Sequence, residues 1–297
     1  MIKEKYVNPF TDFGFKKLFG TELNKDLLID FLNQVVLPQH RRIRTLTYQK
    51  TEQLGNAELD RRAIFDLYCV GENGERFIVE IQKAKQNYFK DRSVFYSTFP
   101  IQEQAKRGEW DFQLTEVYTV GILDFVFHES EGESVVRHEV KLRDQHCRVF
   151  YDKLTLIYLE MPNFTKTEAE LESNYDKWLY VLKHLPYLDK RPPALKERVF
   201  EKLFEAAEIA KFSQDERDMY EESLKYYRDL KNVIDTSYEE GRIEGRIEGK
   251  IEGKIEGKQE AQIEVARKAL QAGLPPQTVA QITGMPIEEI ERLQTAS

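Results

Sequence analysis

Residues 61–86 read RRAIFDLYCVGENGERFIVEIQKAKQ and contain the signal that decides the fold. Two runs rich in β-branched and aromatic residues flank the loop GENGE, whose Asn-Gly pair is typical of hairpins. If this loop is centred on Asn73, opposed positions sum to 146, so Asp66 lies directly across from Glu80 and shares a face with Gln82. A two-residue Asn-Gly turn would instead shift the register by one and separate the faces.

Two carboxylates facing each other across a strand pair need compensating positive charge. Like charges in opposed positions destabilise a sheet, and the apolar neighbours of Asp66 and Glu80 place both acids at the wall of a core, where an isolated charge is costly. Opposed Cβ atoms are about 5 Å apart, which suits one hard divalent cation such as Mg²⁺ held by two carboxylates and waters. The alternative is two surface acids on a solvent-facing side of the strands.

The spacing of these acids carries a resemblance. Asp66, followed after thirteen residues by Glu80-Ile81-Gln82, resembles the bipartite active-site signature of the PD-(D/E)XK nuclease superfamily, with glutamine in the usual lysine position. The stretch NPFTDFGFKKLFG, the pair Arg92 and Tyr96, and the segment EVYTVGILDF are similar to the Rpn family of recombination-promoting nucleases and transposase-like proteins. The likeness covers about the first half of the chain and continues in the style of the tail.

The resemblance implies a Mg²⁺-dependent endonuclease that hydrolyses DNA phosphodiester bonds in recombination or in mobile-element or phage-related processing, with Mn²⁺ as a substitute ion. Asp66 and Glu80 would hold the metal with the backbone carbonyl of Ile81, and the ion would acidify an attacking water and neutralise charge on the scissile phosphate. Gln82 departs from the pattern, because a neutral amide orients water or binds a phosphate oxygen but cannot act as a base. The base is therefore unassigned, with a second metal or the substrate phosphate as alternatives.

Other residues are candidates for the same site. A helix before the hairpin often supplies another acid in this superfamily, and Asp12 matches the family stretch, ahead of Glu22 and Asp30. Asp12 is alternatively an early-turn acid that stabilises the helix dipole. Lys83 would point to the opposite face if the strand continues, whereas Lys85 could reach the site from the following loop.

The helix after the hairpin, predicted from Tyr88 to Arg107, presents one more pair. Arg92 and Tyr96 are four residues apart and share a helix face. Arg92 either reaches a phosphate or lies exposed over a tyrosine that faces the core.

The order of predicted elements indicates an α/β fold, with a mixed central β-sheet flanked by helices in a restriction-endonuclease-like core and a helical C-terminal extension. Thr11 is the expected cap of the first helix, and Ser213 with Glu216 forms a capping box later in the chain. Besides the hairpin and the helix after it, the predicted elements are helices at 11–20 and 24–36, strands at 42–50, 116–127, 135–144 and 153–161, and helices within 174–234.

We divide the chain into four parts. They are a nuclease-like domain at 1–190, a helical extension at 191–238, a tetrapeptide-repeat helix or linker at 239–258, and a small helical interaction domain at 259–297. The sequence Arg191-Pro192-Pro193 marks the first boundary.

Between Glu240 and Lys258 the motif EG(R/K)I repeats every four residues. An isolated helix should be poor here, because each glycine costs about 1 kcal/mol relative to alanine and like charges stack at i,i+4. In a parallel pair packed on the isoleucine or the glycine stripe, the acidic flank of one chain faces the basic flank of the other. The stripe drifts about 40° per repeat, so any seam is short. The segment is either such a dimer seam, making the protein a homodimer or higher oligomer, or a solvated linker.

The tail resembles a helix-turn-helix in its spacing. Ala280, Gly284, Ile287 and Ile290 fall where that motif wants a small residue, a turn and core contacts. The would-be recognition helix, PIEEIERL, is acidic and would oppose a phosphate backbone. We therefore favour an oligomerising or partner-binding role over DNA readout.

Charge is unevenly distributed. The net charge is −8, but residues 1–107 carry 18 basic against 14 acidic side chains (+4), while the remainder carries 26 against 38 (−12). The basic excess thus lies with the candidate site, where DNA phosphates need it. A hydrophobic content of 41% is enough for a large core.

The sequence shows no targeting signal, and its two cysteines indicate no disulfide or metal site. No apolar run reaches about 18 residues, and MIKEKYVNPF lacks a signal-peptide type of hydrophobic region, so we expect a cytoplasmic protein without a membrane partner. Cys69 and Cys147 make neither a disulfide framework nor a metal-ligand spacing, and Cys69 is expected to be a buried strand residue.

Two rival functions remain open. One is a catalytically inactive DNA- or protein-binding oligomer that uses its C-terminal helical tail. The other is a true transposase, which is disfavoured because the sequence shows no separate end-recognition domain with a basic reading helix.

Overall fold

The computed structural model describes residues 4–36, 42–53, 63–105, 111–127, 132 and 134–295. The chain forms two compact units, Met1–Lys231 and Asn232–Ser297. In the described part of the chain, no helix is long and apolar enough to cross a membrane.

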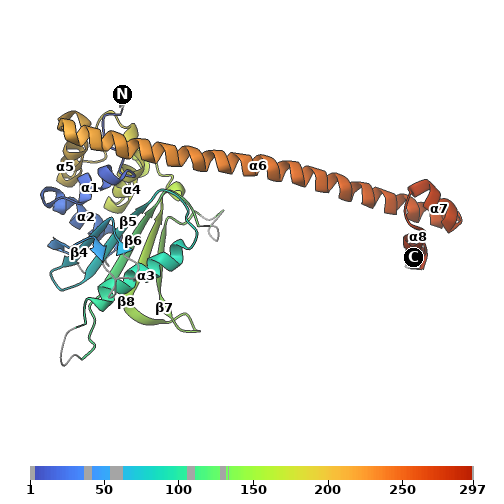
Figure 1. The fold of residues 1–297 in the computed structure, drawn as a ribbon, viewed down its shortest axis with the longest axis horizontal. Coiled ribbons are helices and arrows are strands. Elements are labelled where there is room, and N and C mark those ends of the chain that lie inside the picture. Colours follow the sequence, from blue (N-terminus) through green and yellow to red (C-terminus); the bar gives the residue numbers. More distant parts are fainter. Residues whose placement is uncertain are drawn as a thin grey trace. The chain divides into compact units, whose positions relative to one another are not determined.

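A six-stranded mixed sheet is the centre of the first unit (Figure 1). Its order is β1-β4-β5-β6-β8-β7, in which β5, β6 and β8 are parallel and the other neighbours are antiparallel. The strands are β1 Leu46–Tyr48, β4 Leu67–Gly71, β5 Arg76–Gln82, β6 Val117–Leu123, β7 Arg137–Arg143 and β8 Val149–Glu160, and a separate pair joins β2 Glu52–Gln53 to β3 Ala63–Ile64.

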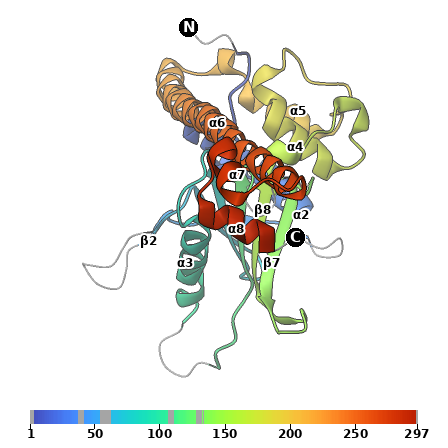
Figure 2. The same ribbon diagram turned by 90° about the vertical axis from the view of Figure 1, so that its right-hand side faces the viewer.

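Helices cover both faces of this sheet, as the resemblance implied (Figures 1 and 2). Strand alternation sends Phe77, Val79 and Ile81 into the main core with α1, α2, α4 and α5. It sends Ile78 to the other face, where it packs with residues of α3. The helices are α1 Asp12–Phe19, α2 Lys25–Val35, α3 Phe89–Gln102, α4 Asn174–His184 and α5 Arg198–Ala207, with short 3₁₀ turns at Glu22–Asn24, Met161–Asn163, Glu168–Glu170, Leu185–Tyr187 and Ile209–Lys211.

The hairpin has the predicted register. Leu67 pairs with Val79 and Cys69 pairs with Phe77, so opposed positions sum to 146. The five-residue loop is closed by the Gly71 N–H, which donates to the Glu75 carbonyl at 2.8 Å. Gly74 has a φ of +86°, a conformation that glycine adopts without steric cost. Cys69 is fully buried, as expected.

Several local predictions are confirmed. Thr11 caps α1 by accepting the Gly14 N–H at 3.0 Å, and the apolar face of α2 is buried. Strand β6 is buried along its whole length because β5 and β8 flank it and helices cover both faces.

Other boundaries differ from the prediction. The first hairpin arm is interrupted, because Ala63–Ile64 pairs with β2 and Asp66 lies in a bend before β4. Arg61 and Arg62 lie outside the described residues. Helix α3 ends at Gln102, just after Pro100, and its predicted end at Arg107 also lies outside the described residues.

The long helix α6, Gln214–Gln271, begins in the first unit. The predicted capping box starts it: the Ser213 N–H donates to Glu216 at 3.0 Å, and the Glu216 N–H donates to Ser213 at 3.3 Å. Its first turns are bonded to the N-terminal segment, because Tyr220 accepts the Asn8 N–H and Ser223 accepts the Phe13 N–H. The tetrapeptide repeat at 240–258 lies within α6 and is helical.

The second unit contains the rest of α6 and two short helices, α7 Pro276–Thr283 and α8 Ile287–Thr295. Ala266, Val279 and Ile290 form its small core. Gly284 ends α7 with a φ of +70°. The tail is thus helical, as predicted, and its partner-binding role stays a prediction.

The fold makes one prediction about Asp30, which accepts the indole N–H of the fully buried Trp178 at 2.7 Å. Asp30→Ala leaves that donor unpaired and should lower the free energy of unfolding by about 1–3 kcal/mol. Asp30→Asn keeps an acceptor and should lose less. Urea denaturation measures both variants, and equal losses would contradict the assigned bond.

Candidate active site

The hairpin brings Asp66 and Glu80 together. The Asp66 N–H donates to Oε1 of Glu80 at 3.1 Å, and the Ile81 N–H donates to Oδ2 of Asp66 at 2.7 Å. Each carboxylate is therefore held by the backbone of the opposite hairpin arm. This reciprocal arrangement exists because the five-residue loop places position 66 across from position 80.

Both acids are electrostatically strained. Glu80 is only 8% exposed, and burial, followed by the charge of Asp66, raises the pKa of Glu80 to about 8. Burial also raises the pKa of Asp66, against the opposing effect of the Ile81 N–H. Among the residues that the structure describes, no lysine or arginine forms an ion pair with either carboxylate. The charges of Arg92 and Lys83 offset those of the two acids without a direct ion pair between described residues.

Gln82 links this pair to α3. Its Nε2 donates to Oε2 of Glu80 at 3.3 Å, and Nη2 of Arg92 donates to its Oε1 at 2.8 Å. Arg92 also donates to Gln86. The Arg92 guanidinium also lies 5.8 Å from the ring centroid of Tyr96, as the second predicted arrangement required, so its contact with a phosphate stays a prediction. Tyr96 packs edge-on against Phe65 and is a core residue of this face.

The prediction for Lys83 depended on a continuing strand, and β5 ends at Gln82. The Lys83 ammonium lies 5.3 Å from the ring centroid of Tyr226 on α6. Burial lowers the pKa of Lys83, whereas the charges of Asp12 and Asp66 act to raise it. Lys85, the predicted substitute, is exposed.

Asp12 lies in the first turn of α1, where an acid stabilises the helix dipole, as the alternative prediction for this residue required. Its carboxylate pairs with Lys16 at 2.9 Å, and its charge contributes to the raised pKa of Asp66. Among the described residues, no group of three or more His, Cys, Asp or Glu side chains is arranged to hold a metal. Asp12 is thus near the pair without completing a three-acid centre. Glu22, the other alternative, pairs with Lys25.

A divalent cation fits the donor set of the pair. Glu80 is buried and Asp66 is half-buried. Two carboxylates that repel each other in such a place favour a bound cation, and oxygen donors suit a hard ion. Two protein carboxylates leave coordination positions for water and phosphate, which is how Mg²⁺ is usually held in phosphoryl-transfer sites.

Gly121 is a site neighbour that the sequence analysis did not identify. It pairs with Glu80 across β5 and β6, and a Cβ there would lie 3.0 Å from a ring carbon of Tyr158. A cavity of about 10 Å³, space for roughly one water, lies between Glu80, Arg92 and these two residues. An isolated glycine in a buried strand was the available signal.

The mixed sheet, its flanking helices and the acidic pair define a PD-(D/E)XK type of α/β core. Residues 9–237 match the family described as PD-(D/E)XK nuclease family transposase. The match covers most of the chain, which therefore belongs to this family, and the family indicates a nuclease. No curated protein matches the chain, and no solved structure matches it either.

The raised pKa of Glu80 predicts a pH-dependent stability. Between its ordinary pKa of 4.5 and about 8, the folded protein holds a proton that the unfolded chain releases. This contribution is fully present below pH 4.5 and is lost as the pH rises to about 8. In EDTA, the free energy of unfolding should fall by about 1–4 kcal/mol from pH 5 to pH 8.

Urea titrations of the metal-free protein across this range measure the effect. Glu80→Gln should flatten the pH dependence, and the exposed Glu221→Gln should leave it unchanged. A slope that is equal in the wild type and in Glu80→Gln would show that Glu80 is not the titrating group.

Proposed function

We propose that this protein is a Mg²⁺-dependent DNA endonuclease, with Mn²⁺ as a substitute ion, and that it processes DNA in recombination or in mobile-element or phage-related reactions in the cytoplasm. One observation carries the proposal: two carboxylates are held against each other by backbone hydrogen bonds and have no basic partner within the described residues. Membership of a nuclease family supports it.

Asp66 and Glu80 would hold the cation, together with the carbonyl of Ile81. When bound, the cation supplies Lewis-acid charge for the scissile phosphate and for the attacking water. The hydrogen bonds from Asp66 N and Ile81 N fix both carboxylates before any ligand arrives, so little ordering is required on binding.

Two basic residues are the candidates for binding the phosphate. Arg92 is held through Gln82, and Lys83 is held over Tyr226. Gln82 cannot supply positive charge. Relatives with a lysine at the position of Gln82 have a positive charge there. We assign the role of that charge to Lys83, the next residue in the chain.

Supercoiled plasmid tests this proposal. The wild type should nick it with Mg²⁺ or Mn²⁺ and leave it intact in EDTA. Asp66→Asn and Glu80→Gln remove the charge that binds the cation and should lower the nicking rate by about 100-fold or more. Circular dichroism and the melting temperature would show that both variants keep the fold.

A matched pair of lysines tests the role of Lys83. Lys83→Met should lower nicking by about 10- to 100-fold, and Lys83→Arg should retain more activity because the positive charge remains. The exposed Lys85→Met should stay close to the wild type. Plasmid that remains intact with the wild type and either metal would contradict the nuclease proposal and favour the inactive binding protein.

We also propose that the repeat of α6 pairs two copies of the chain in parallel. Its four isoleucines, which lie on one stripe, are each about half exposed: Ile243 47%, Ile247 54%, Ile251 54% and Ile255 53%. Nothing lies within 4 Å of a Cβ added at the repeat glycines between Gly241 and Gly257. Parallel pairing on the isoleucine stripe buries these side chains and sets acidic flanks against basic ones.

Substitutions on the two stripes test this pairing. Ile247→Asn with Ile251→Asn should weaken self-association of the full chain at least about tenfold. Gly245→Ala with Gly249→Ala should raise helicity and keep the dimer. Sedimentation equilibrium measures both. A monomeric wild type at about 50 μM would contradict pairing, and dissociation by the alanine variant would move the seam to the glycine stripe.

A further inference from the structure

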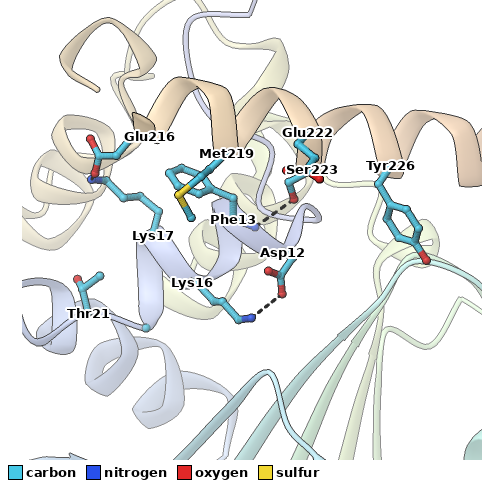
Figure 3. Close-up of a pocket in the computed structure, with 11 residues that line it drawn as sticks. Asp12, Phe13, Lys16, Lys17, Thr21, Glu216, Met219, Glu222, Ser223 and Tyr226 are labelled. Atoms are coloured by element: carbon cyan, nitrogen blue, oxygen red, sulfur yellow. Dashed lines mark hydrogen bonds and ion pairs between the residues drawn. The ribbon is translucent and has the colours of Figure 1, made fainter. Parts of the chain in front are cut away.

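A hollow of about 710 Å³ lies between α1 and the first turns of α6 (Figure 3). Its apolar lining includes Phe13, Met219 and Tyr226, and Asp12, Lys16 and Ser223 place polar groups around them. The size is that of a small-ligand site, and the combination of apolar surface with a few polar groups is typical of one. The carboxylate pair is not part of its lining, so the hollow is separate from the site described above.

Tyr226 connects the hollow to that site. Its ring projects from α6 toward the sheet (Figure 3), and it meets the ammonium of Lys83 at 5.3 Å. Lys83 directly follows Gln82, whose amide is bonded to Glu80. One side of the ring is thus covered by a cation near the acids, while the residue remains 63% exposed. An exposed aromatic ring beside a phosphate-cleaving centre is suited to stack on a base.

The charges around the hollow favour a base over a phosphate as its occupant. Lys16 is paired with Asp12, and Lys17 is paired with Glu216. Glu222 adds a further acid to the lining, so the walls carry no excess of positive charge for a phosphate. Two other basic groups lie outside the lining: Lys83 contacts the Tyr226 ring and Arg92 donates to Gln82. A strand whose phosphate lies at the acids would place a neighbouring base over Tyr226.

We propose that this hollow receives an unpaired base of the DNA strand, stacked on Tyr226, so that the preferred substrate carries a single-stranded segment beside the cleavage point. This inference rests on the proposed nuclease function and narrows its substrate. A paired base cannot reach the ring, because stacking in the hollow requires the base to leave the duplex.

Binding of labelled DNA to the full-length protein in Ca²⁺ tests the inference without cleavage. The probes are a fully paired duplex and the same duplex with a single-stranded extension that carries 2-aminopurine at one position at a time. The wild type should bind the extended probe more tightly and quench 2-aminopurine at one or two adjacent positions. Tyr226→Ala should abolish the quenching and weaken binding of the extended probe by about 5- to 100-fold, with the paired duplex unaffected.

Two variants control for loss of the fold and for general aromatic contact. Tyr226→Trp should retain both quenching and affinity. Tyr238→Ala removes an exposed tyrosine twelve residues later on α6, 74% exposed, and should behave as the wild type. Equal affinity of the wild type for the two probes, or quenching that survives in Tyr226→Ala, would overturn the inference.

The outcome can be separated from that of the nuclease proposal. Plasmid nicking that depends on Asp66, together with equal binding of both probes, overturns only the base-binding hollow. Quenching that depends on Tyr226, in a protein that cuts no DNA, supports the hollow and contradicts the nuclease.

Discussion

The repulsion between the buried carboxylate of Glu80 and the half-buried carboxylate of Asp66 is the constraint on which the site depends. Asp66 and Glu80 would separate if their side chains were free, but each accepts a hydrogen bond from the backbone of the opposite hairpin arm. Strand β5 cannot shift to relieve this repulsion, because it pairs with β4 on one side and β6 on the other. The fold therefore stores an unfavourable interaction at a fixed place, as binding sites for cations commonly do.

The surroundings of this pair come from distant parts of the chain. Helix α3 supplies Arg92 through Gln82, α1 supplies Asp12, and α6 supplies Tyr226 against Lys83. Within the described residues, the basic groups that approach the acids form no ion pair with them, and the carboxylates accept hydrogen bonds from two backbone N–H groups and from Gln82. Gln82 has a structural part in this arrangement, because its amide joins Glu80 to Arg92. A lysine at that position would place positive charge against the acids.

Local patterns predicted what local interactions determine. The register of the hairpin followed from its loop length, the start of α1 from Thr11, and the buried strand β6 from its apolar run. The position of Lys83 could not be predicted, because it depends on where β5 ends. Nor could its contact with Tyr226, because the two residues are more than 140 positions apart and no periodicity connects them. Contacts of this kind follow from tertiary packing.

The length of the turn from Gly71 to Glu75 limits which deletions the hairpin tolerates. Successive strand residues alternate between faces, so removing a single turn residue would transfer Glu80 to the other side of the sheet while leaving the strand's composition nearly intact. Lineages that retain the acids can therefore lose their geometry through one codon deletion. In comparing homologues, the count of residues between the two acids is as informative as the acids themselves.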